Sequence, residues 1–208
     1  MKFNKISKKL ALLGMAFLIS SGCAFGTRSV ELGYPPADKK SMGPAKAEAA
    51  EVPRNQKQFL SVMPFTDLRE DQIEIGCVRN GFGMKTARVE AKNSVADWVT
   101  MATIMELEKE GFSVSRVENM DESVTGPVLE GQILRVFCDS YFSYSGEVML
   151  SARIALDENE IMKKTYTGKG SAGTNWGASS KSYGQSLSLA LADAMSALVA
   201  DVVVALGE

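Results

Sequence analysis

Apolar and polar side chains alternate most regularly from Val148 to Leu156, where every second residue is apolar. This period is typical of a strand with one buried face. Asp157 to Glu160 then supplies turn residues, and Ile161 to Thr167 continues as a second strand. Val128 to Cys138 precedes both and is rich in residues that favour strands. The three segments together predict an antiparallel meander.

Two other segments show helical spacing. In the first, Ser94 followed by Asp97 resembles a capping box, and an apolar face then runs to Gly111, which predicts a helix over residues 94 to 110. The second is predicted over about 182 to 206 by a regular series of apolar residues: Leu187, Leu191, Ala194, Leu198 and Val202.

Shorter apolar runs at Phe59 to Phe65 and Phe112 to Arg116 predict two further strands. Residues 67 to 80 are polar and rich in turn formers, and Gly168 to Gly177 is predicted to be a glycine-rich loop. Each helix must bury one face, so the order of elements predicts an α+β fold: a two-layer sandwich of a mixed β-sheet, containing the antiparallel meander, with two helices packed on one face.

The N-terminus has the pattern of an export signal. A basic stretch is followed by an apolar run from Leu10 to Ile19 and by small residues before Cys23. As a helix this ten-residue run spans roughly 15 Å, which is short for a hydrocarbon core of about 30 Å and disfavours a retained transmembrane anchor. Residues 1–22 are therefore predicted to be a signal peptide.

Small residues directly before a cysteine resemble a lipobox, in which the cysteine receives a lipid. Ser21 and Gly22 fit this pattern, and Cys23 would be the lipidated residue, palmitate being one of its acyl chains. Ser20 departs from the usual leucine, which leaves an ordinary signal peptide cut nearby as the alternative. Ala24 is not the aspartate of an inner-membrane retention signal, so we expect the outer membrane, with the domain in the periplasm. Several acyl chains hold a protein to a bilayer almost permanently.

Residues 23–57 carry four of the six prolines and lack periodicity, which predicts a tether. Within it, the alternation of Val30, Leu32 and Tyr34 leaves open a short strand near 28–34. Residues 58–208 are then a single globular α+β domain, a size that can bury a core.

Charge and composition exclude several functions. The 23 basic residues fall to 19 when Lys2, Lys5, Lys8 and Lys9 leave with the signal, against 25 acidic residues, so the net charge is near −6. A nucleic-acid-binding protein would need a basic cluster, and we expect no nucleic-acid partner. The sequence has no histidine, which excludes catalysis by Ser-His-Asp or Cys-His and zinc sites that need imidazole. We therefore expect no enzyme, no cofactor and no metal.

The densest charge cluster of the domain begins at Asp67 and Arg69 and is followed by Asn80. The favoured interpretation is structural: Asp67 and Arg69 pair across the end of the first strand, and Asn80 satisfies backbone groups. A partner-binding surface is the second interpretation. Catalysis by loop carboxylates is the least favoured.

Once Cys23 is lipidated, Cys77 and Cys138 remain, an even number in an oxidising compartment. A disulfide would tie the predicted loop around Cys77 to the third strand, provided the Cα atoms come within about 7 Å. Both residues also fit the role of small buried hydrophobes. The sequence leaves these two states open.

Residues 168–173 match the pattern GxGxxG, but no helix and parallel strand follow as a dinucleotide fold requires, so a flexible turn is favoured. Several aromatic residues fall in predicted turns, where they either cap the ends of the sheet or anchor a partner. These residues are Tyr141, Phe142, Tyr144 and Trp176.

With these elements placed, the segment Val62 to Arg69, the pairs Ile75-Gly76 and Asn80-Gly81, Trp98-Val99 and Glu110 to Phe112 resemble the YajG family of bacterial lipoproteins over roughly residues 28 to 206. That family is functionally uncharacterised, so the resemblance implies location and fold rather than an activity.

Taken together, the sequence predicts a lipid-anchored lipoprotein of the periplasm and outer membrane that acts as a non-catalytic binding or accessory module of the cell envelope. Its partners would be the membrane, through the N-terminal lipid, and an unidentified envelope protein. The alternative is a structural lipoprotein that binds lipid or peptidoglycan. An apolar cleft between helices and sheet would favour lipid, and a flat polar surface would favour a protein partner.

Overall fold

The computed structural model describes residues 26–35, 58–119, 124–157, 159–174 and 179–207. The predicted signal peptide 1–22, the lipidation site Cys23, Trp176 and most of the predicted tether lie outside the described residues.

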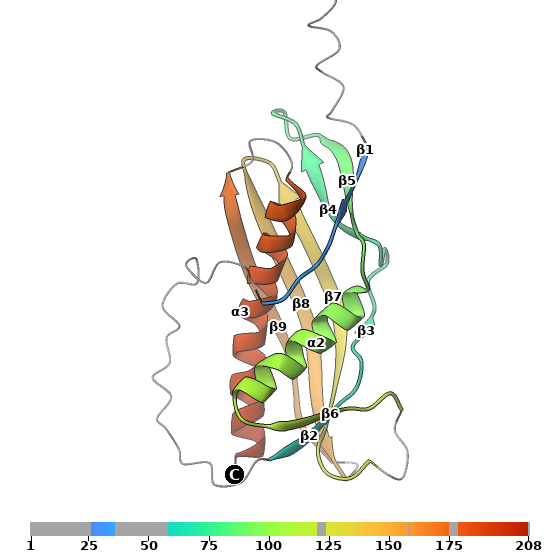
Figure 1. The fold of residues 1–208 in the computed structure, drawn as a ribbon, viewed down its shortest axis with the longest axis vertical. Helices are drawn as coiled ribbons and strands as arrows, with labels where there is room; N and C mark the ends of the chain where they lie inside the picture. Colours follow the sequence, from blue (N-terminus) through green and yellow to red (C-terminus); the bar gives the residue numbers. More distant parts are fainter. Residues whose placement is uncertain (1–25, 36–57, 120–123, 158, 175–178, 208) are drawn as a thin grey trace, which may run out of the picture.

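A nine-stranded mixed sheet forms one layer of the described structure (Figure 1). In chain order its strands are β1 (Gly26–Val30), β2 (Phe59–Val62), β3 (Thr66–Asp67), β4 (Glu74–Arg79), β5 (Lys85–Ala91), β6 (Ser113–Arg116), β7 (Val128–Ser140), β8 (Ser143–Leu156) and β9 (Asn159–Thr174).

Strand β7 is the centre of the sheet. On one side it pairs antiparallel with β8, and β8 pairs antiparallel with β9, which is the predicted meander. On its other side β7 pairs in parallel with β2, β3 and β4 at successive positions along its length. Strand β5 then pairs antiparallel with β4, β1 pairs parallel with β5, and β6 pairs parallel with β2.

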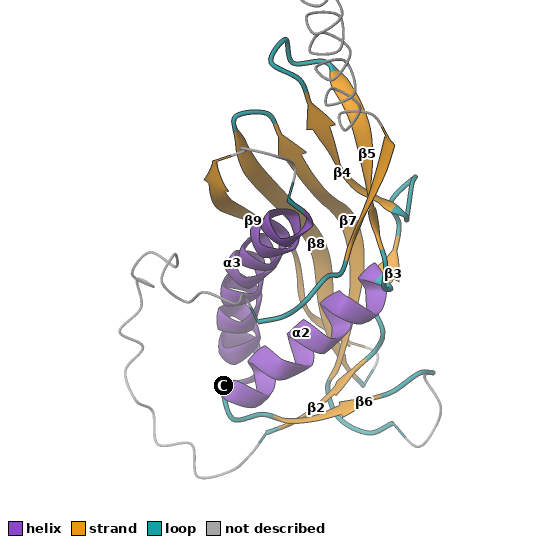
Figure 2. Ribbon diagram, turned by 45° about the horizontal axis from the view of Figure 1, so that its top comes forward, coloured by secondary structure: helices purple, strands orange, loops and turns teal. Residues whose placement is uncertain are grey.

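Both helices, α2 (Val95–Lys109) and α3 (Ser180–Leu206), lie on the same face of this sheet (Figures 1 and 2). Helix α2 begins where the sequence predicts, because the Ser94 hydroxyl accepts a hydrogen bond from the Asp97 amide at 3.1 Å. Helix α3 packs along β8 and β9 and is apolar and long enough to cross a membrane by length and composition, but half of its most apolar stretch is buried in the fold. The predicted α+β sandwich with two helices on one face is confirmed.

The hairpin of β4 and β5 corrects the interpretation of residues 67 to 80 as a polar loop. Ile75, Val78, Ala87 and Val89 are its buried residues on the helix side of the sheet. The hairpin also carries β-bulges, which interrupt the alternation of buried and exposed residues. Cys77 therefore lies in a strand and not in a loop.

The glycine-rich segment also differs from its prediction, because β9 continues through it to Thr174. A Cβ atom at Gly168 would lie 2.0 Å from the Ala190 carbonyl oxygen, and one at Gly170 would lie 2.3 Å from that of Ser186. Both glycines thus allow the backbone of α3 to approach the sheet closely. Their spacing serves helix packing and not a phosphate site.

Residues 26–35 are part of the folded domain. Beyond β1, the Leu32 amide donates to Asn93 Oδ1 at 2.9 Å, and Trp98 Nε1 donates to the Gly33 carbonyl at 3.0 Å. Tyr34 Oη donates to Glu106 Oε1 at 2.7 Å, so this segment also contacts α2.

Candidate functional site

The face of the sheet opposite the helices is left open by the described residues (Figure 2). Because side chains alternate along a strand, the residues between the buried ones of β7, β8 and β9 point to this face. They are mostly polar or charged: Glu130, Gln132, Leu134, Arg135, Phe137, Asp139, Ser145, Glu147, Met149, Ser151, Arg153, Lys163, Thr165, Thr167 and Lys169. We call this set the open face.

Charges on the open face are paired across strands. Arg153 Nη2 lies 2.6 Å from Glu130 Oε2, and Arg135 Nε lies 2.5 Å from Glu147 Oε2. Both arginine side chains are about half exposed. Exposed pairs of this kind contribute at most about 1 kcal/mol to stability, so the residues are free to exchange their partners for those of another molecule.

A hollow of about 260 Å³ lies where the β2–β3 connection meets the open face. Met63, Pro64 and Thr66 form one wall, and Glu130 and Arg153 are among the residues opposite. It is open to solvent and mainly polar, which suits a peptide or polar group rather than an acyl chain.

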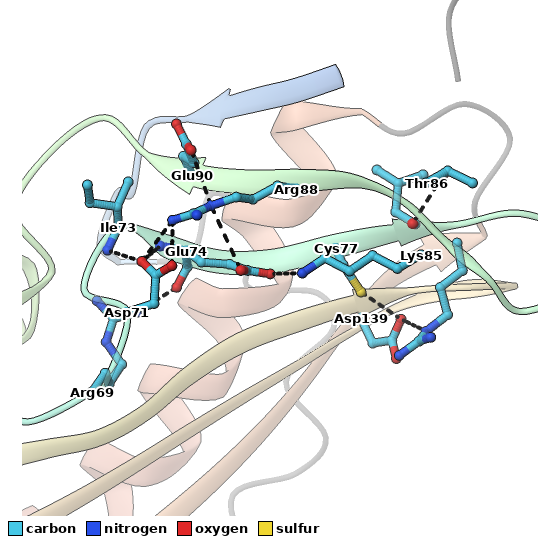
Figure 3. A network of polar contacts seen from close by, with 12 residues as sticks. Arg69, Asp71, Ile73, Glu74, Cys77, Lys85, Thr86, Arg88, Glu90 and Asp139 are labelled. Atoms are coloured by element: carbon cyan, nitrogen blue, oxygen red, sulfur yellow. Dashed lines mark hydrogen bonds and ion pairs between the residues drawn. The ribbon is translucent and has the colours of Figure 1, made fainter. Parts of the chain in front are cut away.

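On the same side of the sheet, β4 and β5 carry a second charged group centred on Arg88 (Figure 3). Arg88 Nη2 lies 2.7 Å from Asp71 Oδ2, and Arg88 Nε lies 3.2 Å from Glu90 Oε1 and 3.8 Å from Glu74 Oε2. Glu74 also pairs with Lys85 at 2.5 Å. The amides of Glu74 and Ile73, which donate to Asp71 Oδ1, hold the pKa of Asp71 below its usual value together with Arg88.

Asp67 and Arg69 form the buried ion pair that fastens the loop after β3. Arg69 Nη2 lies 2.7 Å from Asp67 Oδ2, and the two side chains are only 6% and 10% exposed for Arg69 and Asp67 respectively. The guanidinium also donates to the carbonyls of Glu74 and Gln72 at 2.9 and 2.6 Å. The side-chain contacts given for this pair lie between Asp67 and Glu74 and hold the loop that joins β3 to β4.

Asn80 stands at the other end of β4 and does not meet Asp67 or Arg69. Its side-chain Oδ1 accepts from the backbone amides of Phe82 and Met84, both at 3.0 Å. Its backbone amide donates to the Met84 carbonyl. Asn80 therefore closes the β4–β5 hairpin. Sequence reasoning named the three residues as one set, but the structure separates them into two turns.

Cys77 and Cys138 are both free and buried. Gly76 pairs with Cys138 and Cys77 pairs with Asp139, so the two thiols sit one position out of register on neighbouring strands and point to opposite faces of the sheet. This geometry corrects the possible disulfide prediction, because the two thiols are free and do not face each other. Cys138 faces α3, whereas Cys77 Sγ lies 3.7 Å from Asp139 Oδ1 on the other side.

Neither thiol is arranged as a nucleophile. Burial raises the pKa of Cys138 to about 12, and burial together with the negative charge of Asp139 raises that of Cys77. Asp139 is held by Arg79, whose Nε donates to both carboxylate oxygens at 2.8 and 2.9 Å. A reactive thiol would need a lowered pKa, and both shifts run in the opposite direction.

The helices pack against the sheet through buried side chains. Tyr144 and Tyr183, which are both fully buried, meet edge to face with ring centroids 5.0 Å apart beside the start of α3. Close approach of α3 at Gly146, Gly168 and Gly170 continues this packing along the meander. Within the described residues, apolar side chains of the two layers form one core. Among those residues no group of Cys, Asp and Glu is placed to hold a metal ion.

No protein-family model matches the sequence. A search of curated proteins likewise gives no match.

Solved structures with a similar fold do exist. A DUF330 protein from Xanthomonas campestris is 14% identical, with a TM-score of 0.55 over 86% of this chain and 94% of that one. A hypothetical protein from Chlamydia trachomatis is 12% identical, with a TM-score of 0.51 over 74% of this chain and all of that one. At such identities the likeness shows the fold alone.

A lipoprotein from Neisseria meningitidis is also among the similar structures, at 14% identity and a TM-score of 0.37 over 70% of this chain and 97% of that one. This similarity is too weak to carry the description of that protein over to this chain.

Proposed function

We propose that this chain is a lipid-anchored envelope protein whose domain acts as a non-catalytic binding or accessory module, with the open face as its partner surface. Cys23 would carry the lipid, in the outer membrane, and the domain would lie in the periplasm. The sequence resemblance to YajG family lipoproteins agrees with this proposal.

The observation that carries the proposal is the contrast between the two sides of the sheet. One side is closed by α2 and α3 over a buried apolar core, and the other presents a broad polar surface with exchangeable ion pairs. A flat polar surface fits a protein partner. The alternative is a structural lipoprotein that holds lipid or peptidoglycan, and the crosslinking experiment below distinguishes the two.

Crosslinking in intact cells tests the partner surface. A photoreactive amino acid at Thr167, which is exposed on β9, should capture an envelope protein of defined mass. The matched control is the same amino acid at Val204, which is 70% exposed on α3 at the opposite side of the molecule and should not give that product.

Charge reversal at Arg153 is the second part of the crosslinking experiment. Arg153→Glu replaces a half-exposed side chain of the open face, so the protein should stay folded while the crosslink at residue 167 is lost. Capture of only lipid or peptidoglycan at residue 167, or equal capture from residues 167 and 204, would contradict the proposal.

A further inference from the structure

Four apolar or aromatic side chains project from two neighbouring turns at one end of the sheet. Phe82 is 90% exposed and Met84 59% exposed in the β4–β5 hairpin, and Phe142 is 71% exposed and Tyr141 37% exposed in the β7–β8 turn. We call these four residues the apolar tip. Exposed apolar side chains are ordinary when scattered, but a group of four at one end indicates a contact surface.

The apolar tip is held in a defined shape. Asn80 Oδ1 binds the amides of Phe82 and Met84, and Arg79 Nη1 donates to the Gly83 carbonyl at 2.9 Å. Gly83 has a φ of +82°, a conformation in which a residue with a side chain would be strained.

The two turns are also joined to each other. Tyr141 Oη donates to the Gly81 carbonyl at 2.9 Å, and the rings of Tyr141 and Phe142 contact each other at a tilt of 51°, with centroids 4.0 Å apart. These hydrogen bonds hold the two turns that present the exposed rings.

The position of the tip relative to the N-terminus identifies its partner. Gly26, the first residue of β1, pairs with Ala87, which follows Met84 by three residues in the chain. β1 therefore begins at the end of the sheet that carries the apolar tip (Figure 1). Cys23 precedes Gly26 by three residues, which span at most about 11 Å. A lipid on Cys23 brings this end of the domain, and not the opposite end, to the bilayer surface.

We propose that the apolar tip inserts into the interfacial layer of the membrane that holds the lipid, so that the long axis of the sheet stands away from the bilayer. This inference rests on the anchor at Cys23 proposed above. Phe and Met side chains enter the boundary between headgroups and acyl chains, and Tyr favours the same boundary because its ring is apolar and its hydroxyl polar. Two projecting turns fit a bilayer surface better than they fit the groove of a second copy.

The test uses the full lipidated protein in vesicles of phosphatidylethanolamine and phosphatidylglycerol. An environment-sensitive fluorophore is attached to cysteine in Phe82→Cys, with Ile161→Cys as the matched control. Ile161 is an exposed apolar residue of β9 whose neighbouring pairs lie at the far end of the meander from the apolar tip. The native thiols Cys77 and Cys138 are buried and should not be labelled.

We expect the probe at residue 82 to shift its emission to shorter wavelength and to be quenched by lipids that carry a nitroxide on the acyl chain, whereas the probe at residue 161 shows neither effect. Equal, weak quenching at both positions would overturn the docking of the tip. Shielding of residue 82 from a water-soluble quencher without quenching by the lipids would also overturn it, in favour of a protein partner.

Vesicle flotation separates this inference from the anchor itself. If the protein floats with the vesicles but residue 82 stays in water, the insertion of the apolar tip is rejected and the anchor at Cys23 is not. Loss of flotation by the wild-type protein would reject the anchor and the tip together.

Discussion

Asp67 and Arg69 show how a pair of charged residues beside a strand end can serve the fold rather than a partner. Both side chains are buried, and the guanidinium that balances Asp67 also binds two loop carbonyls. The sequence predicted their pairing, because an Asp and an Arg two residues apart after a buried strand have few other ways to satisfy their charges. It could not separate Asn80 from them, since its distance in space depends on the hairpin that the sequence analysis missed.

Substitution of Asp67 tests this role. Asp67→Ala leaves a buried guanidinium without its carboxylate, and we expect the free energy of unfolding to fall by about 1–3 kcal/mol. The measurement is urea unfolding followed by circular dichroism. Glu118→Ala is the control, because Glu118 is an exposed partner of Arg116 and its loss should cost less than about 1 kcal/mol. Equal stability of the two variants would contradict a structural Asp67, and a stable Asp67→Ala protein that has lost function would make the loop a functional site.

Cys77 and Cys138 should behave as buried free thiols. The raised pKa of each keeps it protonated at neutral pH, so neither should react with iodoacetamide in the native protein. In denaturant, without reductant, two thiols per lipidated chain should become alkylated, as mass spectrometry would show. A mass corresponding to no free thiol would establish the disulfide that the register of β4 and β7 argues against.

At the level of elements, the meander and both helices could be predicted because the period of two is regular along most of β8 and apolar residues recur at helical spacing along α2 and α3. The β4–β5 hairpin could not, since its outer face carries Glu74, Arg79, Lys85, Arg88 and Glu90, and its bulges shift the alternation. Those charges suppress the apolar signal of a strand, although the inward residues remain apolar. The ion pairs of Arg88 and of Asp139 could not be predicted for the same reason. Their members come together only after β4 has paired with β5 and β7.

The glycines of β9 provide a test at this scale. Gly168→Ala would place a methyl group against the backbone of α3, so we expect α3 to be displaced and stability to fall by about 1–3 kcal/mol. Gly33→Ala is the control because a Cβ atom there meets no atom within 4 Å. Its effect should stay within about 0.5 kcal/mol. A Gly168→Ala protein as stable as the control would show that the helix does not need this close approach.

For the whole molecule, the sheet topology determines three regions: the face covered by helices, the open face and the end that carries the apolar tip. The helices close one face of the sheet, the strands leave the other face open and polar, and the parallel pairing of β1 with β5 places the start of β1 at the end of the sheet that carries the apolar tip. The sequence predicted the first of these regions from amphipathic patterns. It could not predict the other two, because they depend on strand order and on which turns share an end of the sheet.

Removal of the exposed rings of the apolar tip should leave the stability of the fold nearly unchanged. Phe82 and Phe142 are largely exposed, so the double variant Phe82→Ser and Phe142→Ser should unfold within about 0.5 kcal/mol of the wild type. Thermal unfolding of the protein in detergent measures this. A large loss of stability would show that the two rings support the turns and are not available to a bilayer.

The central claim is that a lipid on Cys23 holds this domain to a membrane, and metabolic labelling with a radioactive fatty acid tests it most directly. We expect the wild-type protein to be labelled and Cys23→Ser not to be, while the variant still accumulates as a folded domain. Label retained in Cys23→Ser, or an unlabelled wild type, would contradict the claim.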